Sequence, residues 1–308
     1  MTDLVRRAFV WTYQQPVLLS LITMTCWAGN FIAARGAHTD VPPITLAVIR
    51  WAGAFLILLP FAWPYLKRDL PTILQHWRIM LVFSVFGITC FNTFAYIGLQ
   101  YTVAMNALLL QSSLPVMIAL FIFVIYREMP TLFQVIGVAV SLTGVLYVVV
   151  QGDFAVLKTL DLNRGDVWLL AAFAAWAIYT ALLRARPPIH WLSFLAATFF
   201  LGLLILSPFW IMELMRGRTV NPSWAAVAAT SYVVLFPSVI AYTCFNRAVQ
   251  LAGANRVAPF FHLVPVLGSV LAILILGERI ELYHIVGFAL VMGGIGLASR
   301  RKVSDAAA

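Results

Sequence analysis

The chain has 308 residues, of which 63% are hydrophobic types and only 10% are charged. Soluble domains carry about 25% charged residues, so the composition excludes a soluble enzyme, a coiled coil and a disordered regulator. The net charge of +9 does not indicate nucleic-acid binding, because the 20 Lys and Arg residues are spread between hydrophobic runs and form no basic stripe.

A chain of this composition belongs in a membrane, where a crossing helix needs about 20 mostly apolar residues. Such segments occur, in chain order, at 16–37, 43–63, 78–99, 103–126, 131–150, 165–184, 189–212, 223–246, 254–276 and 281–299. The longest polar interval between them runs from Gln151 to Asp166. The first segment is not a cleavable signal peptide, because it leads directly into a second span. The sequence predicts an all-α integral membrane protein with ten transmembrane helices.

The distribution of Lys and Arg residues predicts the orientation. If the N-terminus is cytoplasmic, 13 of these residues lie at the cytoplasmic side and six at the opposite side, while Arg50 lies within a span. Loops on the cytoplasmic side of membrane proteins are enriched in positive charge. Both termini are therefore expected in the cytoplasm.

The two halves of the chain resemble each other. Identical residues 150 positions apart include Gln100 and Gln250, Ala104 and Ala254, Pro115 and Pro265, Glu128 and Glu278, Gly137 and Gly287, and Gly144 and Gly294. Residues 1–150 and 151–308 are thus predicted to be two repeats of five spans each. Because five is odd, the second repeat enters the membrane from the opposite side. Inverted repeats recur in secondary transporters, with the substrate site near the midplane between the halves.

Several short sequence motifs also resemble those of a known family. They are the stretch Trp27-Ala28-Gly29-Asn30 and two copies of a Pro…Glu…Gly…Gly segment, at Pro115, Glu128, Gly137 and Gly144 and at Pro265, Glu278, Gly287 and Gly294. With the five-plus-five spans, they resemble the EamA family of the drug/metabolite transporter superfamily. Overall likeness is greatest to the YddG-type exporters of aromatic amino acids. The resemblance implies a bacterial inner (plasma) membrane protein that exports aromatic and other hydrophobic amino acids by alternating access.

The position of the acidic residues bears on the solute. All eleven lie in termini, loops or the ends of spans. A proton-coupled exporter of cations would be expected to place a carboxylate inside the membrane. The sequence therefore favours a neutral or zwitterionic solute with an apolar part. A proton-coupled multidrug or organic-cation exporter, or an exporter of another small metabolite, remains the alternative.

Spans three and eight supply the first candidate substrate-binding residues. Asn92 and Tyr96 lie one helical turn apart, as do Tyr242 and Asn246, and the shift of 150 residues places each Asn on a Tyr. Amides could hold the ammonium and carboxylate groups of an amino acid, while Tyr rings could stack on its side chain. Hydrogen bonding between helices is the alternative explanation.

Other polar and aromatic residues deep in spans are further candidates for substrate binding: Trp27, Asn30, Asn106, Ser113, Trp176, Tyr179 and His262. The two Trp residues either line the cavity or pack helices together. His262 is the one histidine deep in a span and could titrate near neutral pH. A lone histidine inside a membrane is more often a hydrogen-bonded structural residue.

Two prolines and one arginine suggest how a carrier could work. Pro115 and Pro265 are expected to kink spans four and nine, and they are candidate hinges for gating. Arg50 is the one formal charge within a span. It could neutralise a substrate carboxylate, or it could snorkel or pair with a helix end.

The ends and faces of the spans carry structural signals. Glu128 beside Arg127, and Glu278 beside Arg279, are expected to form ion pairs at helix ends. The glycine pairs spaced by seven residues, Gly137 with Gly144 and Gly287 with Gly294, predict close packing of spans five and ten against a neighbour.

Enzymatic activity is not expected. Ser112 and His262 occupy equivalent positions, which alone does not make a catalytic pair, and the cysteines show no metal-ligand spacing. No Gly-rich phosphate-binding loop is present, so we expect no cofactor and no ATP-driven step. The expected partners are a small-molecule solute and the lipid bilayer, without nucleic acid. The sequence leaves the oligomeric state open, with a monomer as the simplest expectation.

Overall fold

The computed structural model describes residues 11–36, 40–102, 107, 110–153, 155, 163–276 and 281–299. All regular secondary structure within these residues is helical, which confirms the all-α prediction. The helices are α2 (Pro16–Gly36), α3 (Pro43–Gln75), α4 (Trp77–Phe83), η1 (Ser84–Cys90), α5 (Phe91–Gly98), α7 (Leu114–Tyr126), α8 (Leu132–Val149), α9 (Arg164–Leu182), η3 (Leu183–Ala185), α10 (Trp191–Met215), α11 (Trp224–Val234), η4 (Leu235–Ile240), α12 (Ala241–Ala252), α13 (Ala254–Val257), η5 (Ala258–His262), α14 (Leu263–Leu276) and α15 (Leu282–Ala298).

Six continuous helical segments are long and apolar enough to cross a membrane: Pro43–Gln75, Trp77–Gly98, Leu132–Val149, Arg164–Ala185, Trp191–Met215 and Trp224–Ala252. Leu114–Tyr126 and Leu282–Ala298 are shorter apolar helices. Large apolar side chains such as Phe61, Leu204 and Phe209 are more than half exposed on the outside of these helices. A contiguous apolar exterior fits a lipid environment. The described helices thus support a multi-pass membrane protein, and the total of ten crossings stays a prediction.

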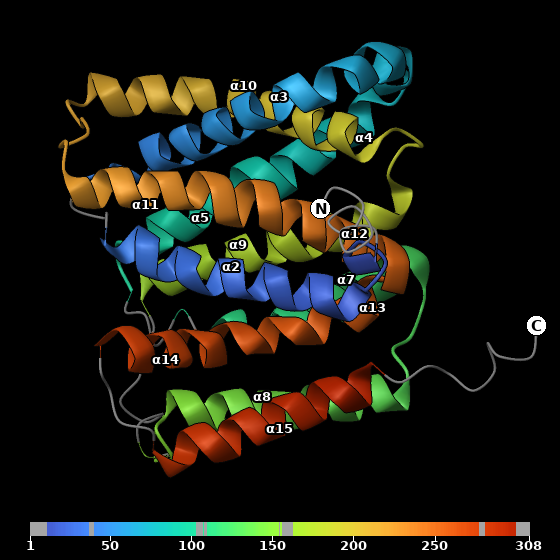
Figure 1. The fold of residues 1–308 in the computed structure, drawn as a ribbon, viewed down its shortest axis with the longest axis vertical. Coiled ribbons are helices and arrows are strands. Elements are labelled where there is room, and N and C mark those ends of the chain that lie inside the picture. Colours follow the sequence, from blue (N-terminus) through green and yellow to red (C-terminus); the bar gives the residue numbers. More distant parts are fainter. Residues whose placement is uncertain are drawn as a thin grey trace, which may run out of the picture.

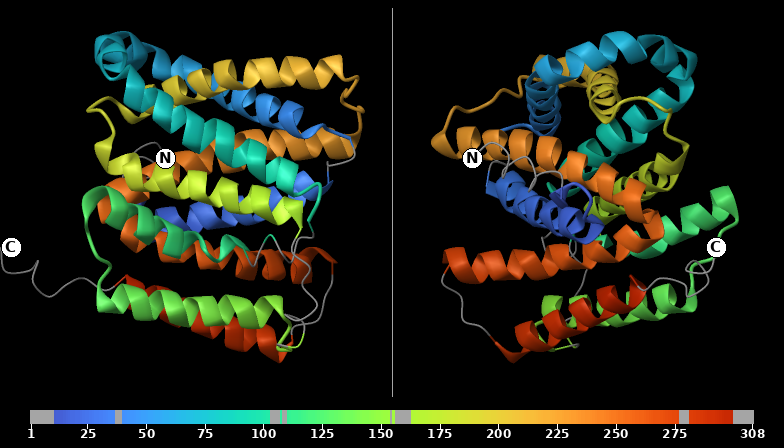
Figure 2. Two further views of the ribbon diagram at one scale, coloured as in Figure 1. Left: turned by 180° about the vertical axis from the view of Figure 1, so that it is seen from behind. Right: turned by 45° about the vertical axis from the view of Figure 1, so that its right-hand side comes forward.

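The helices run side by side in a stack (Figure 1). Helices α3 and α10 pair at one edge, α2, α5, α9, α11 and α12 fill the middle, and α8 pairs with α15 at the other edge. Figure 2 shows the same order from behind. We call the end of the stack that carries Arg184 and the tip of α12 the Arg184 face. The opposite end, which carries Glu213 and the start of α3, is the Glu213 face.

Glycines set the close approach of α8 and α15. A Cβ atom on Gly137 would lie 2.5 Å from the carbonyl oxygen of Gly294, and one on Gly144 would lie 2.7 Å from the carbonyl oxygen of Gly287. Any larger residue would therefore push the two backbones apart. The expected close packing of the fifth and tenth spans is confirmed, and the neighbour of each is the other.

Buried carboxylates hold the two ends of the α3–α10 pair. Oε2 of Glu213, in the last turn of α10, accepts hydrogen bonds from the backbone N–H of Thr45 at 2.7 Å and from its hydroxyl at 2.8 Å. At the other face, Oδ2 of Asp69 on α3 accepts from the backbone N–H of His190 at 2.7 Å. Backbone N–H groups at a helix start have no partner within the helix, and its dipole favours a negative charge there. These two acids therefore act at helix ends.

His190 precedes α10 and caps it. Its ring Nδ1 accepts a hydrogen bond from the backbone N–H of Leu192 at 3.3 Å, so this nitrogen must be unprotonated. Burial lowers the pKa of His190 below the ordinary value of 6.5, and the positive charges of Arg68 and Arg186 add to the effect, while Asp69 opposes it. The neutral, capping form is thus the favoured one.

Two sequence predictions about helix ends are corrected. Pro115 and Pro265 do not kink continuous α-helices: Pro115 lies in the first turn of α7, and Pro265 is the third residue of α14, directly after the 3₁₀ turn η5. A proline is tolerated in a first turn because the N–H it lacks has no partner there. Glu128 pairs with Arg184 instead of Arg127. The second predicted pair, Glu278 with Arg279, lies outside the described residues. Arg127 ends α7 with a left-handed φ of 59°, before the chain continues into α8.

Candidate functional site

An aromatic cluster fills the centre of the stack, made by Trp27, Trp176, Tyr179, Tyr242, Phe245 and Phe261. The rings of Trp27 and Trp176 meet edge to face, with centroids 5.1 Å apart at 89°. Trp27 also stacks on Phe261 at 5.5 Å and 15°. Edge-to-face and offset contacts of this kind each add about 0.5–1.5 kcal/mol beyond burial. The cluster joins α2, α9, α12 and η5, helices far apart in sequence.

The candidate Tyr and Asn residues are bonded to protein groups around this cluster. Tyr179 donates its hydroxyl to Oδ1 of Asn246 at 2.9 Å, and Asn246 Nδ2 donates to the carbonyl of Tyr242 at 2.7 Å. Asn92 Nδ2 lies 3.4 Å from the carbonyl oxygen of its own helix at Ile88. All four side chains are buried. The structure therefore brings them together as a hydrogen-bonded core between helices.

Two π-helical turns occur 150 residues apart, in the third and eighth predicted spans. They are η1 and η4, and such turns are often found at functional sites. The carbonyl of Gly87 in η1 accepts the hydroxyl of Tyr242 at 2.5 Å. The carbonyl of Pro237 in η4, at the equivalent position, accepts Nε1 of Trp27 at 3.1 Å and Nη2 of Arg50 at 3.2 Å. Each half thus offers one carbonyl to side chains of the other half.

Arg50 forms a polar cluster with residues from both halves. Its Nε donates to Oγ of Ser238 at 2.7 Å, and its Nη1 donates to Oδ1 of Asn30 at 3.0 Å and to the hydroxyl of Tyr96 at 2.9 Å. The side chain is only 1% exposed. Arg50 therefore does not snorkel to a membrane surface. We call Arg50, Asn30, Tyr96 and Ser238 the Arg50 cluster.

His262 and Ser113 are hydrogen-bonded to residues outside these two clusters. His262 is fully buried, with Nε2 3.0 Å from the carbonyl oxygen of Ser112 and Nδ1 2.5 Å from Oγ of Ser141. Since a carbonyl can only accept, Nε2 carries a proton, and the ring connects three spans as a structural residue would. Ser113 donates to the carbonyl of Leu110 at 2.6 Å. Asn106 lies outside the described residues.

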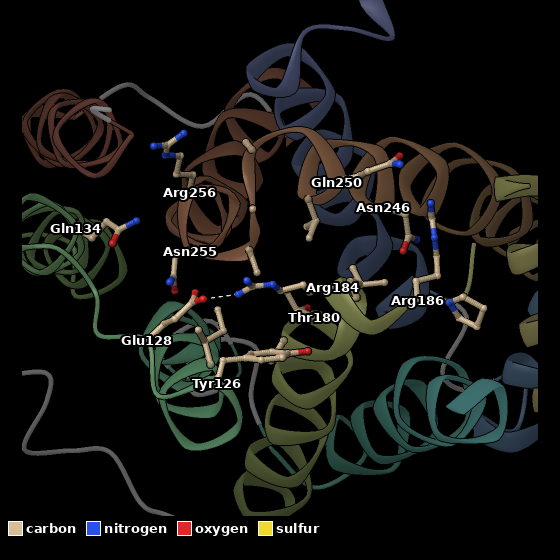
Figure 3. Close-up of a pocket in the computed structure, with 18 of the residues that line it drawn as sticks. Tyr126, Glu128, Gln134, Thr180, Arg184, Arg186, Asn246, Gln250, Asn255 and Arg256 are labelled. Atoms are coloured by element: carbon tan, nitrogen blue, oxygen red, sulfur yellow. Dashed lines mark hydrogen bonds and ion pairs between the residues drawn. The ribbon is translucent and has the colours of Figure 1, made fainter. Parts of the chain in front are cut away.

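A cavity of about 710 Å³ opens at the Arg184 face (Figure 3). Among the predicted site residues it is lined by Asn246, whose side chain is hydrogen-bonded to Tyr179 of the aromatic cluster. The other polar lining residues are Tyr126, Glu128, Gln134, Thr180, Arg184, Arg186, Gln250, Asn255 and Arg256. In Figure 3 the side chain of Arg184 crosses the cavity toward Glu128, with which it is paired. Burial lowers the pKa of Arg186, on the wall of this cavity.

Sequence reasoning missed this cavity lining, because most of it comes from span ends and connections. The signal for it in the sequence is the excess of Arg residues at the span ends on this side, which also predicts the orientation. The cavity has a polar, positively charged mouth, and Asn246 on its wall is hydrogen-bonded to Tyr179 of the aromatic cluster. Such a mouth attracts solutes with a negative group.

Comparison with known proteins decides the family. The model of the EamA-like transporter family matches this chain twice, over residues 14–150 and 163–300. The chain belongs to the EamA-like transporter family. This EamA-like protein is therefore a membrane transporter of the drug/metabolite transporter superfamily, as the resemblance implied, and the family is one of transporters, not enzymes.

Relatives of this EamA-like transporter are known mostly by the same general description. An uncharacterized transporter of Archaeoglobus fulgidus is 30% identical over 290 residues, which are 92% of this chain and 97% of that protein. The uncharacterized transporter YyaM of Bacillus subtilis is 27% identical over 252 residues, 80% of each chain. A chloroplastic WAT1-related protein of Arabidopsis thaliana is 24% identical, over 91% of this chain and 68% of that one. A solved crystal structure shares the fold, with a TM-score of 0.72, 17% identity, and coverage of 92% of this chain and 97% of that one.

Proposed function

We propose that this EamA-like transporter is a secondary carrier that exports aromatic and other hydrophobic amino acids by alternating access. The halves 1–150 and 151–308 are its two inverted five-helix repeats. It lies in a bacterial plasma membrane with both termini and the Arg184 face in the cytoplasm. The excess of Lys and Arg on that side supports this orientation.

The observation that carries the proposal is the contact, through Asn246, between the cavity wall and the aromatic cluster. Asn246 lines the cavity and is hydrogen-bonded to Tyr179, whose ring lies against Trp176 with centroids 4.9 Å apart. An aromatic solute that enters from the Arg184 face would meet an amide first and then ring faces and edges. When the solute binds, ring–ring contacts within the protein are replaced by contacts between rings and solute. The free energy of binding is then small, and a carrier requires this in order to release its solute.

The reciprocal contacts of the two π-helical turns support alternating access. Tyr242 of the second half binds the carbonyl of Gly87, while Trp27 of the first half binds the carbonyl of Pro237. The two family matches, 14–150 and 163–300, support a division into two similar halves. Two halves with equivalent contacts can exchange conformations at similar energy, which opens the solute path first to one face and then to the other.

Proton-coupled export of cations is the weaker proposal. The described carboxylates that are buried, Asp69, Asp166 and Glu213, all bind groups at helix starts. Each is therefore committed to structure at a membrane face. No carboxylate among the described residues lies beside the aromatic cluster, where a cation and a proton would have to compete.

Counterflow in proteoliposomes tests the aromatic path. Tyr179→Phe removes the hydroxyl bonded to Asn246 and keeps the ring. Tyr65→Phe makes the same chemical change in a tyrosine on α3 that stacks on His190 away from the cavity. Tryptophan counterflow should fall several-fold in Tyr179→Phe and stay unchanged in Tyr65→Phe. Equal counterflow in both variants would exclude the Tyr179 hydroxyl from the solute path.

A further inference from the structure

Among the residues that the structure describes, the guanidinium of Arg50 has no anionic partner, although it is buried. It is 1% exposed, and the ion pairs among the described residues are Arg68 with Asp69 and Arg184 with Glu128. An isolated charge within a bilayer is costly, and intramembrane charges usually pair with one another or serve a function. The position of Arg50 therefore calls for an explanation beyond packing.

The partners of Arg50 are all neutral. Four of the five N–H groups of a guanidinium are taken up by an amide oxygen, two hydroxyls and a main-chain carbonyl, from Asn30, Tyr96, Ser238 and Pro237. These groups solvate the cation but leave its charge uncompensated. One N–H of Nη2 has no partner among the described residues. The arrangement holds a guanidinium ready for an anion, because hydrogen bonds to a charged acceptor are about twice as strong as neutral ones.

The same polar pair occurs in the other half without a cation. Trp27 aligns with Trp176, so Asn30 aligns with Tyr179, and Tyr96 aligns with Asn246. In the second half the phenol and the amide bond directly to each other, at 2.9 Å. In the first half each of them bonds to Nη1 of Arg50 instead. A phenol and an amide at these positions can thus bond to each other without an arginine, and Arg50 adds a positive charge to the pair in the first half.

The Arg50 cluster adjoins the aromatic cluster. Nη2 of Arg50 and Nε1 of Trp27 bind the same carbonyl oxygen, that of Pro237. The guanidinium carbon also lies 4.9 Å from the ring centroid of Trp51, which meets Tyr242 edge to face at 5.1 Å. A solute could place its ring among the rings of the aromatic cluster. A polar group two or three bonds from that ring would then reach the guanidinium of Arg50. Asn30, the one partner that is half-buried, marks the side from which the guanidinium can be reached.

We propose that Arg50 is the receptor for the carboxylate of the transported solute, which exchanges with Asn30 and Tyr96 as the acceptor on Nη1. The substrate class is then aromatic carboxylates, in which the acid group is required and the ammonium group is not. This inference rests on the proposed function in one respect, that the solute path runs through the aromatic cluster. Arg is suited to the role because its planar guanidinium matches the geometry of a carboxylate.

Three related indoles test the proposal on the unmodified protein. Tryptophan carries both charged groups, indole-3-propionate lacks the ammonium group, and tryptamine lacks the carboxylate. Each is added as a competitor to the counterflow of radiolabelled tryptophan in proteoliposomes. Indole-3-propionate should compete within a few-fold of tryptophan, while tryptamine should be at least about tenfold weaker, the loss expected for a missing charged hydrogen bond. Equal competition by tryptamine and indole-3-propionate would overturn the proposal.

Variants locate the effect at Arg50. Arg50→Gln should abolish the preference for indole-3-propionate over tryptamine, and Arg50→Lys should keep part of it, because the charge remains. Arg78→Gln, at an exposed arginine on α4, is the matched control and should behave as the unmodified protein. If Arg50→Gln elutes as aggregate, the comparison rests on Arg50→Lys. Full carboxylate preference in a monodisperse Arg50→Gln protein would contradict the assignment.

Direct transport of the same compounds separates this inference from the proposed function. If radiolabelled indole-3-propionate moves in an Arg50-dependent manner and tryptophan does not move, amino-acid export is wrong and the carboxylate receptor stands. If tryptophan and tryptamine move equally well, aromatic transport stands and the carboxylate receptor is wrong.

Discussion

Adjacent glycines on α15 allow a sharp test of the packing at the edge of the stack. A Cβ atom on Gly294 would lie 2.5 Å from the carbonyl oxygen of Gly137 and 2.5 Å from the backbone nitrogen of Ser141. A Cβ atom on Gly293 would meet no atom within 4 Å. The atoms facing Gly294 are mostly backbone, so they cannot rotate aside, and α8 and α15 would have to separate.

Gly294→Ala should therefore destabilise the protein by about 1–3 kcal/mol, the usual cost of overpacking. Gly293→Ala should leave stability unchanged or raise it by up to about 1 kcal/mol, because alanine is the better helix former. At about 2–4 °C per kcal/mol for a large domain, the two Tm values should differ by roughly 2–16 °C. Thermal unfolding of both variants in one detergent measures this difference. Equal Tm values would refute the backbone contact between α8 and α15.

Three further perturbations test other parts of the structure. Glu213→Gln should lower the free energy of unfolding by about 1–3 kcal/mol, because a buried amide nitrogen would face backbone N–H groups. Glu128→Gln, at an exposed ion pair, is the control and should leave the Tm nearly unchanged. Equal effects of the two substitutions would contradict the capping role of Glu213. The pKa of His190 is lowered in the folded protein, so below about pH 6.5 the unfolded chain binds a proton that the folded chain does not. The Tm should therefore be constant above that pH and fall below it, and His190→Asn should make this fall smaller. An equal fall in both proteins would exclude His190 as its source. Gly87→Ala would place a Cβ 2.3 Å from the ring of the buried Tyr179, so tryptophan counterflow should drop strongly, and unchanged counterflow would show that this ring is free to move.

Hydrophobicity made most of the fold predictable. Long apolar runs have one stable arrangement in a bilayer, as helices whose backbone groups bond internally, so the helical segments fall close to the predicted spans. The main difference is α3, which continues to Gln75 instead of ending near 63. Its last turns carry Lys67 and Arg68. A prediction from runs of apolar residues ends where polar residues begin, even if the helix continues.

The site was predictable in its residue types but not in its contacts. Arg50 was visible as the one charge within a span, whereas the convergence of Asn30, Tyr96 and Ser238 upon it depends on how α2, α5 and η4 pack. The proline prediction was wrong because sequence periodicity does not show where a 3₁₀ turn replaces an α-helix, as it does before Pro265. Spacing along the chain predicts neighbours within one helix, and the partners of buried polar groups belong to other helices.

The central claim is transport of aromatic amino acids along a path without an intramembrane carboxylate. Its most direct test is uptake by the purified protein in liposomes, with tryptophan, phenylalanine, threonine, alanine and a hydrophobic cation, each with and without a pH gradient. The account predicts saturable uptake of tryptophan and phenylalanine that is insensitive to the gradient. Movement of the cation driven by protons, with no uptake of any amino acid, would contradict it.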